Sequence, residues 1–135
     1  MIKGLDHIAV AVSDLDAAVK LWTETFQVAV SHREIIQDQL VEVAMIKLGS
    51  LHVELISPIS SDSPVAKFIE KRGEALHHFA VASESTQDEL DRMKQSGIPL
   101  IDEMARAGAK GSRIGFIHPQ ALGGVLVEIV DHQKE

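Results

Sequence analysis

The hydrophobic residues of the chain follow two periods, alternating in short runs and recurring every three or four positions in longer ones. "LDHIAVAV" (5–12) alternates as a half-buried strand does. Beyond Ser13, the residues Leu15, Ala18 and Trp22 recur on one helical face. The pattern predicts a strand followed directly by an amphipathic helix.

The rest of the chain continues with the same two periods. Ser13 with Asp16, and Thr86 with Glu89, have the spacing of a capping box, and each pair predicts a helix start. Further strands are expected near 28–33, 40–48, 51–57, 76–82, 98–102, 113–118 and 125–130, a short helix from Pro64 to Gly73, a longer helix over 85–97, and a glycine-rich loop over 105–112.

The order strand, helix, three strands occurs twice, which indicates an internal duplication. We expect an α+β fold made of two paired βαβββ modules with a cleft between them. Residues 1–135 would form a single domain, with module one at about 1–59, a linker and short helix at about 60–74, and module two at about 75–132.

Composition narrows the class of protein. The formal net charge is −7, so general binding to nucleic acid or to an anionic membrane is not expected. The chain has no cysteine, which excludes disulfides and thiolate metal sites. The beginning does not read as a secretory signal, and no apolar run is long enough to span a bilayer, so a cytoplasmic location is expected.

Histidine and glutamate recur at matching places in the two modules. His7 and His78 stand in the matching strands, each beside alanines, and Glu54 and Glu128 stand in "HVELI" and "LVEIV". A histidine or a glutamate alone in a strand is usually structural, but here both types recur at nearly equal separation. Their nitrogen and oxygen atoms suit a divalent ion such as Co, Mn, Ni, Zn or Fe.

Several longer stretches carry a family resemblance. "LDHIAVAVSDLDAAVKLW", "LHVELISP", "SPVAKFIEKRGEALHHFAV" and "GSRIGFIHPQALGGVLVEIV" resemble the vicinal-oxygen-chelate (glyoxalase/bleomycin resistance/dioxygenase) superfamily, and within it the methylmalonyl-CoA epimerases. The resemblance spans nearly the whole chain. It implies the βαβββ pairing described above and a metal site formed by His7, Glu54, His78 and Glu128.

The same resemblance implies roles for further residues. Glu42, in "LVEVAMI", and Glu128 would be the two carboxylates that transfer the α-proton, while Ser112 and Arg113 would contact substrate. Two carboxylates on opposite sides of a carbon allow one to remove a proton and the other to return it. Gln120 stands after "HP" where the family often has lysine.

The function implied is an isomerase, an epimerase that interconverts (2R)- and (2S)-methylmalonyl-CoA through a metal-stabilised enolate. The expected partners are an acyl-CoA substrate and a second copy of the chain in a homodimer. The alternatives are a glyoxalase-type lyase or isomerase with the same ligands, and a non-catalytic small-molecule binding protein without metal. A dioxygenase fits less well, because it normally uses two histidines and one carboxylate.

Overall fold

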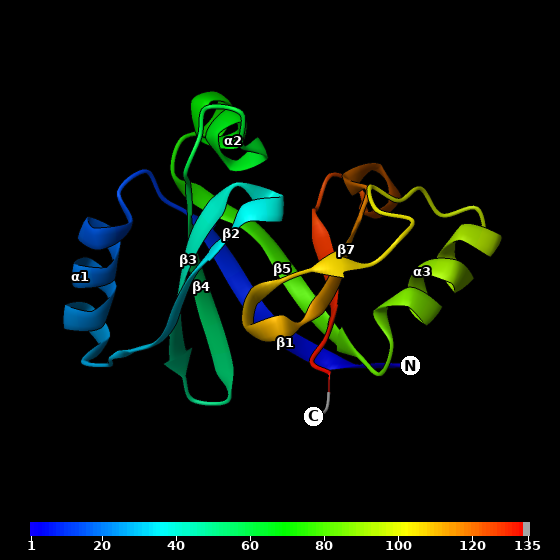
Figure 1. Ribbon diagram of the computed structural model, residues 1–135, viewed down its shortest axis with the longest axis horizontal. Coiled ribbons are helices and arrows are strands. Elements are labelled where there is room, and N and C mark those ends of the chain that lie inside the picture. The colour runs from blue at the N-terminus through cyan, green and yellow to red at the C-terminus, as the bar shows by residue number, and fades with distance from the viewer. Residues whose placement is uncertain (134–135) are drawn as a thin grey trace. The chain divides into compact units, whose positions relative to one another are not determined.

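The alternating runs become strands in the computed structural model, which describes residues 1–133 (Figure 1). The described chain divides into two units, each with strands and helices of its own. The N-terminal unit is His7–His77, and the C-terminal unit combines Met1–Asp6 with the segment that begins at His78. The boundary lies near the expected start of module two, but the first six residues group with the second unit.

The N-terminal unit has four neighbouring strands in the order β2-β3-β4-β1, here called the N-terminal sheet. Its elements are β1 (Ile2–Ala11), α1 (Leu15–Phe26), β2 (Val30–Ile36), a short helix η1 (Gln37–Gln39), β3 (Val41–Leu48), β4 (Leu51–Pro58) and α2 (Pro64–Arg72). β1 and β4 run parallel, and the other neighbours run antiparallel. This is the predicted βαβββ order.

α1 covers one face of the N-terminal sheet, as Figure 1 shows. Leu15 is buried against Ala44 and Leu55, and Trp22 packs at the edge of the same cluster. The helix is capped by Asp14, one residue after the predicted cap Ser13, because the Asp14 carboxylate accepts a hydrogen bond of 3.0 Å from the backbone N–H of Ala17.

The C-terminal unit repeats this topology with the strand order β5-β8-β7-β6. Its elements are β5 (Ala75–Ser83), α3 (Thr86–Gln95), β6 (Arg106–Ala107), η2 (Ala109–Gly111), β7 (Arg113–Ile117), η3 (Pro119–Leu122) and β8 (Val127–Asp131). β5 and β8 run parallel, and β7 pairs antiparallel with both β6 and β8. The mixed α+β fold with a duplicated βαβββ motif is therefore confirmed.

The predicted strand over 98–102 is reduced to one bridge, between Leu100 and Ile117. Pro99 has no N–H to offer a ladder. Beyond the bridge, the Asp102 carboxylate accepts a hydrogen bond of 2.8 Å from the backbone N–H of Phe116. A side chain thus takes the place that a backbone carbonyl would have in a strand ladder. The edge strand forms instead at β6, inside the segment expected to be a loop.

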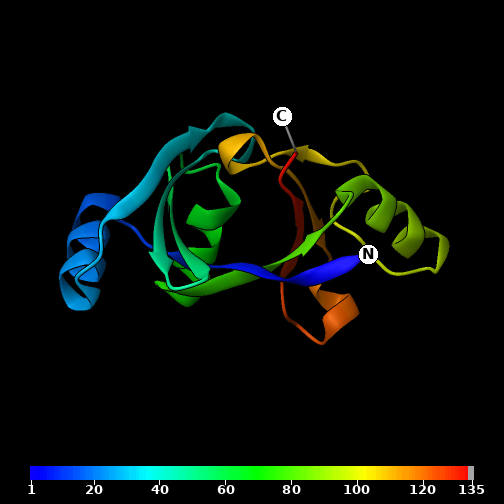
Figure 2. The same ribbon diagram turned by 90° about the horizontal axis from the view of Figure 1, so that it is seen from below.

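In the C-terminal unit, α3 packs against β7 and β8, and Figure 2 shows it beside those strands. Met93 packs with Ile117 and Ile129. Ser85 caps this helix by accepting from the N–H of Asp88, whereas Thr86, the predicted cap, donates its hydroxyl hydrogen to the carbonyl oxygen of Arg113 at 2.9 Å. Within residues 1–133, none of the helices combines the length and the apolar character needed to cross a bilayer.

Candidate metal-binding site

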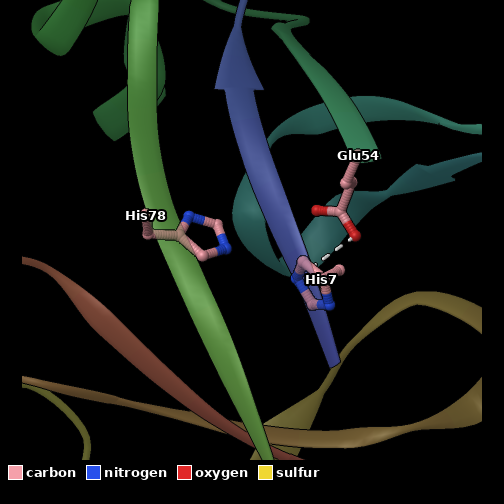
Figure 3. A group of neighbouring side chains, drawn as sticks. All are labelled: His7, Glu54 and His78. Atoms are coloured by element: carbon pink, nitrogen blue, oxygen red, sulfur yellow. Dashed lines mark ion pairs between the residues drawn. The ribbon is translucent and has the colours of Figure 1, made fainter. Parts of the chain in front are cut away.

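His7 and Glu54 form a buried pair in the N-terminal unit. His7 lies on β1 and Glu54 on the parallel neighbour β4, and their side chains are 5% and 10% exposed. The His7 Nε2 and Glu54 Oε2 atoms are 3.7 Å apart (Figure 3). A buried carboxylate needs a cationic or metal partner, because burial in apolar surroundings disfavours an isolated charge.

His78 and Glu128 form the corresponding pair in the C-terminal unit. His78 lies on β5, also drawn in Figure 3, and Glu128 on the parallel neighbour β8. Their Nε2 and Oε2 atoms are 3.8 Å apart, with side chains 3% and 5% exposed. The Phe116 ring stands edge-on to the His78 imidazole at 5.1 Å, and this contact limits how the imidazole can turn.

The strand register explains why each pair has room. Glu54 lies opposite Ala9, and Glu128 lies opposite Ala80. Both alanines are fully buried, and their single methyl groups leave space on the face that carries the glutamates. The same arrangement of histidine, alanine and glutamate on two parallel strands is therefore built twice.

These donors fit a divalent transition ion. Each unit offers an imidazole nitrogen and a carboxylate oxygen, ligands that suit Zn, Co, Mn, Ni or Fe and do not require sulfur. Both carboxylates are buried beside an imidazole, and a bound cation would offset the cost of burying them. Repetition in the sequence had singled out these four residues, and the structure places them as two histidine–glutamate pairs.

Glu42 lies on the other face of the N-terminal sheet. Met45 lies opposite Glu54 in the β3–β4 ladder, so it shares the face of that glutamate. Residues three positions apart in a strand point to opposite faces, and Glu42 therefore shares the α1 face with Ala44. The register does not bring Glu42 beside the pair of His7 and Glu54.

Glu42 instead belongs to a charged group that the sequence did not reveal. Its carboxylate accepts a hydrogen bond of 3.0 Å from Arg33 Nε on β2. The same guanidinium lies 2.7 Å from the carboxylate of Asp16 on α1. Hydrogen bonds to Glu42 and then to Asp16 raise the pKa of Arg33 above its ordinary value. The group links β2, β3 and α1 on the face opposite Glu54.

Ser112 and Arg113, the expected substrate contacts, lie at the start of β7. Ser112 is buried, and its N–H donates to the carbonyl oxygen of Ala109. Arg113 is exposed and donates from Nη2 to the carbonyl oxygen of Ala105 at 3.2 Å. Ser112 thus has a fixed backbone, while the guanidinium of Arg113 reaches the surface.

A cavity of about 670 Å³ lies in the C-terminal unit beside Arg113. Lys3, Ser83 and Asp131 also line it, so both signs of charge are present. The buried Ser83 hydroxyl has no hydrogen-bond partner among the described residues. The volume of the cavity lies in the range of small-molecule pockets. No sequence motif had marked this cavity, because its walls come from separate strands.

Two other histidines have structural contacts. His77 alternates away from His78 and stands edge-on to the Phe68 ring of α2 at 4.8 Å. Burial lowers the pKa of His77 to about 4. His118 caps η3, since its Nδ1 accepts from the N–H of Gln120 at 3.0 Å.

With this geometry established, comparison with known proteins defines the class. A family model described as the Glyoxalase/Bleomycin resistance protein/Dioxygenase superfamily matches residues 6–116. The chain therefore belongs to that superfamily.

Individual relatives narrow the class further. YqjC, an uncharacterized protein of Bacillus subtilis, is 39% identical, and the match covers 94% of this chain and 91% of that protein. The ethylmalonyl-CoA/methylmalonyl-CoA epimerase of Cereibacter sphaeroides is 34% identical over 96% of this chain and 98% of its own length.

Solved structures give the same result. A Streptomyces coelicolor methylmalonyl-CoA epimerase in complex with 2-nitronate-propionyl-CoA has a TM-score of 0.93 and 34% identity, and the match covers 97% of this chain and 95% of that chain. Further relatives and structural neighbours are also methylmalonyl-CoA epimerases, which are isomerases.

Proposed function

We propose that this chain is a metal-dependent epimerase that interconverts (2R)- and (2S)-methylmalonyl-CoA by transfer of the α-proton. The observation that carries the proposal is the buried histidine–glutamate pair that each unit presents on parallel strands. The relatives named methylmalonyl-CoA epimerase support the substrate class.

The proposal combines the two pairs in one site. The two units would pair into a single vicinal-oxygen-chelate domain, in which His7, Glu54 and His78 would hold one divalent ion. Glu128, which lies 3.8 Å from His78, would be its fourth ligand. Such an ion supplies a Lewis acid for the charge that develops on the thioester oxygen when the α-proton leaves. Ser112 and Arg113 would contact the acyl-CoA from the start of β7.

Glu128 is the carboxylate proposed to take the α-proton. It stands among Ala80, Phe116 and Val130, and these apolar side chains exclude water from its surroundings. Exclusion of water strengthens electrostatic interactions at the reacting carbon. The rigid β5–β8 ladder fixes where this carboxylate stands.

A glyoxalase-type isomerase would use the same ligands on another substrate. Glu42, the second carboxylate that the sequence assigned to proton transfer, favours epimerisation over this alternative, and its catalytic role stays a prediction. The register places Glu42 on the face of Ala44, where its carboxylate accepts a hydrogen bond from Arg33. The choice between the two activities therefore depends on the relatives, two of which are named as epimerases of substituted malonyl-CoA esters.

Proton exchange in heavy water tests the function directly. Protein loaded with Co²⁺ and given (2S)-methylmalonyl-CoA in D₂O is expected to introduce deuterium at the α-position and to produce the (2R) form. NMR spectroscopy measures the deuterium, and a stereospecific coupled assay measures the second form. Absence of any exchange with Co²⁺, Mn²⁺, Ni²⁺, Zn²⁺ or Fe²⁺ would remove the proposal.

The proposal also includes a homodimer and a cytoplasmic location. Sedimentation that shows only monomer would contradict the homodimer. Recovery of the protein in the membrane fraction of its own cells would contradict the cytoplasmic location.

A further inference from the structure

Phe116 is a buried aromatic residue beside the histidine–glutamate pair of the C-terminal unit. Its ring is perpendicular to the imidazole of His78, and the two ring centroids are 5.1 Å apart. Phe116 is also the partner of Glu128 in the β7–β8 ladder. Residues directly opposite each other in an antiparallel ladder have their side chains on the same face. One phenyl ring thus stands beside both members of the pair.

Arg106 and Asp102 hold Phe116 in place. The Arg106 Cζ atom lies 5.9 Å from the centroid of the phenyl ring, within the range of a cation–π contact. The guanidinium forms an ion pair with Asp102, whose Oδ1 lies 3.1 Å from Arg106 Nε. The other oxygen of this carboxylate accepts a hydrogen bond of 2.8 Å from the backbone N–H of Phe116. Both the backbone and the ring of Phe116 are therefore restrained by the same ion pair.

This ion pair acts on the histidine–glutamate pair through packing more than through charge. Arg106 and Asp102 carry opposite charges, so together they add no net charge near His78. Their side chains are 31% and 14% exposed, and salt in the solvent screens the field that remains. A phenyl ring in a close-packed interior, by contrast, limits the rotation of a neighbouring imidazole by direct contact.

We infer that Arg106 and Asp102 are positioning residues, which keep the His78 imidazole in its metal-binding orientation by holding Phe116 against it. This role rests on the proposed function, because it takes His78 to be a metal ligand. Without the guanidinium, the phenyl ring gains freedom to tilt, and the imidazole gains freedom to turn away from Glu128, whose Oε2 lies 3.8 Å from His78 Nε2. Loss of a group that orients a metal ligand typically lowers metal affinity about 10–100-fold.

The N-terminal unit contains a matched control. Arg72 Cζ lies 5.9 Å from the centroid of the Phe68 ring, and that ring lies 4.8 Å from the imidazole of His77 at an interplanar angle of 73°. The same three residue types are in contact in the same order, but His77 is not among the proposed metal ligands. Arg72→Met therefore removes a guanidinium from the same kind of contact without affecting a proposed ligand.

Titration with Co²⁺, followed by the visible absorption of the bound metal, tests this role. Arg106→Met is expected to raise the Kd for Co²⁺ on the order of 10-fold, whereas Arg72→Met should leave it within about twofold of wild type. In a Phe116→Leu background, Arg106→Met should change the Kd by less than about twofold, because the ring through which Arg106 acts is absent.

NMR spectroscopy of the metal-free protein gives a second readout. Wild type is expected to show nuclear Overhauser effects between the protons of the His78 imidazole and those of the Phe116 ring, since these rings are in contact. The effects should weaken in Arg106→Met and persist in Arg72→Met.

The outcomes separate the positioning role from the proposed function. An unchanged Kd in Arg106→Met, or equal increases in Arg106→Met and Arg72→Met, would overturn the positioning role and leave the proposed function in place. Absence of Co²⁺ binding in wild type would overturn the metal site of the proposed function, and the measurements on metal-free protein would then decide whether Arg106 orients His78. If Phe116→Leu does not fold, the comparison of Arg106→Met with Arg72→Met decides the question.

Discussion

At the scale of single residues, small side chains determine where the charged ones fit. Ala9 opposite Glu54 and Ala80 opposite Glu128 leave the space that each carboxylate occupies. A larger aliphatic residue at either alanine would compete for that space, because protein interiors are close-packed. The alanines beside the histidines were visible in the sequence, but their position opposite the glutamates depends on the strand register.

His77 predicts how stability depends on pH. Its pKa is about 4 in the folded protein, because the ring is partly buried, and about 6.5 in an unfolded chain. Between these values the unfolded chain binds a proton that the folded chain does not bind. This contribution to the free energy of unfolding is therefore lost progressively as the pH falls from about 6.5 towards 4.

Urea denaturation at pH 7, 6 and 5 measures this effect. His77→Leu is expected to lose less stability than wild type over that range, because the proton uptake of the unfolded chain at this position is gone. His132→Leu, at an exposed histidine, is the control. Wild type and His77→Leu with parallel pH curves would contradict the assignment.

At the scale of elements, α3 and β7 approach more closely than a side chain would permit. A Cβ atom added to Gly115 would lie 2.7 Å from Cδ1 of Leu90. Leu90 is fully buried, so its side chain has little freedom to move aside. Gly115 is thus required for close packing of the helix on the sheet.

Gly115→Ala is expected to lower the free energy of unfolding by about 1–3 kcal/mol, the usual cost of overpacking a core. Chemical denaturation measures the change. In a Leu90→Ala background the same substitution should cost clearly less, because the atom it strikes is absent. An equal cost in both backgrounds would show that the contact with Leu90 is not the cause.

At the scale of the whole molecule, the proposed ion, if it is shared, would couple the two units. Adding Co²⁺ to metal-free protein is expected to raise the free energy of unfolding by about 2.7 kcal/mol when the free metal is 100-fold above its Kd. Thermal denaturation with and without a chelator measures the rise in Tm.

Histidine variants distinguish one shared ion from two separate ones. His7→Ala and His78→Ala should each remove most of the rise in Tm, because each deletes a ligand of the same ion. His132→Ala, a matched change at an exposed histidine, should retain the rise in Tm on addition of Co²⁺. Loss of only half of the rise in each variant would indicate one ion per unit and contradict the shared site.

The sequence by itself determined the features that depend on local pattern and on repetition. Hydrophobic periodicity predicted the duplicated βαβββ order, since the two periods distinguish strand from helix. Repetition identified His7, Glu54, His78 and Glu128, because two different residue types recurred together. Glycine, proline and capping residues located most helix ends to within a residue or two.

Only the tertiary structure decided which face of the sheet each residue of β3 occupies. Side chains alternate with a period of two, so an error of one position moves a residue through the sheet. The pairing of Met45 with Glu54 puts Val43, and not Glu42, on the face of the sheet that carries Glu54. Long-range contacts likewise replaced part of the expected strand over 98–102 by a hydrogen bond that the N–H of Phe116 donates to the Asp102 carboxylate. No local pattern encodes this contact.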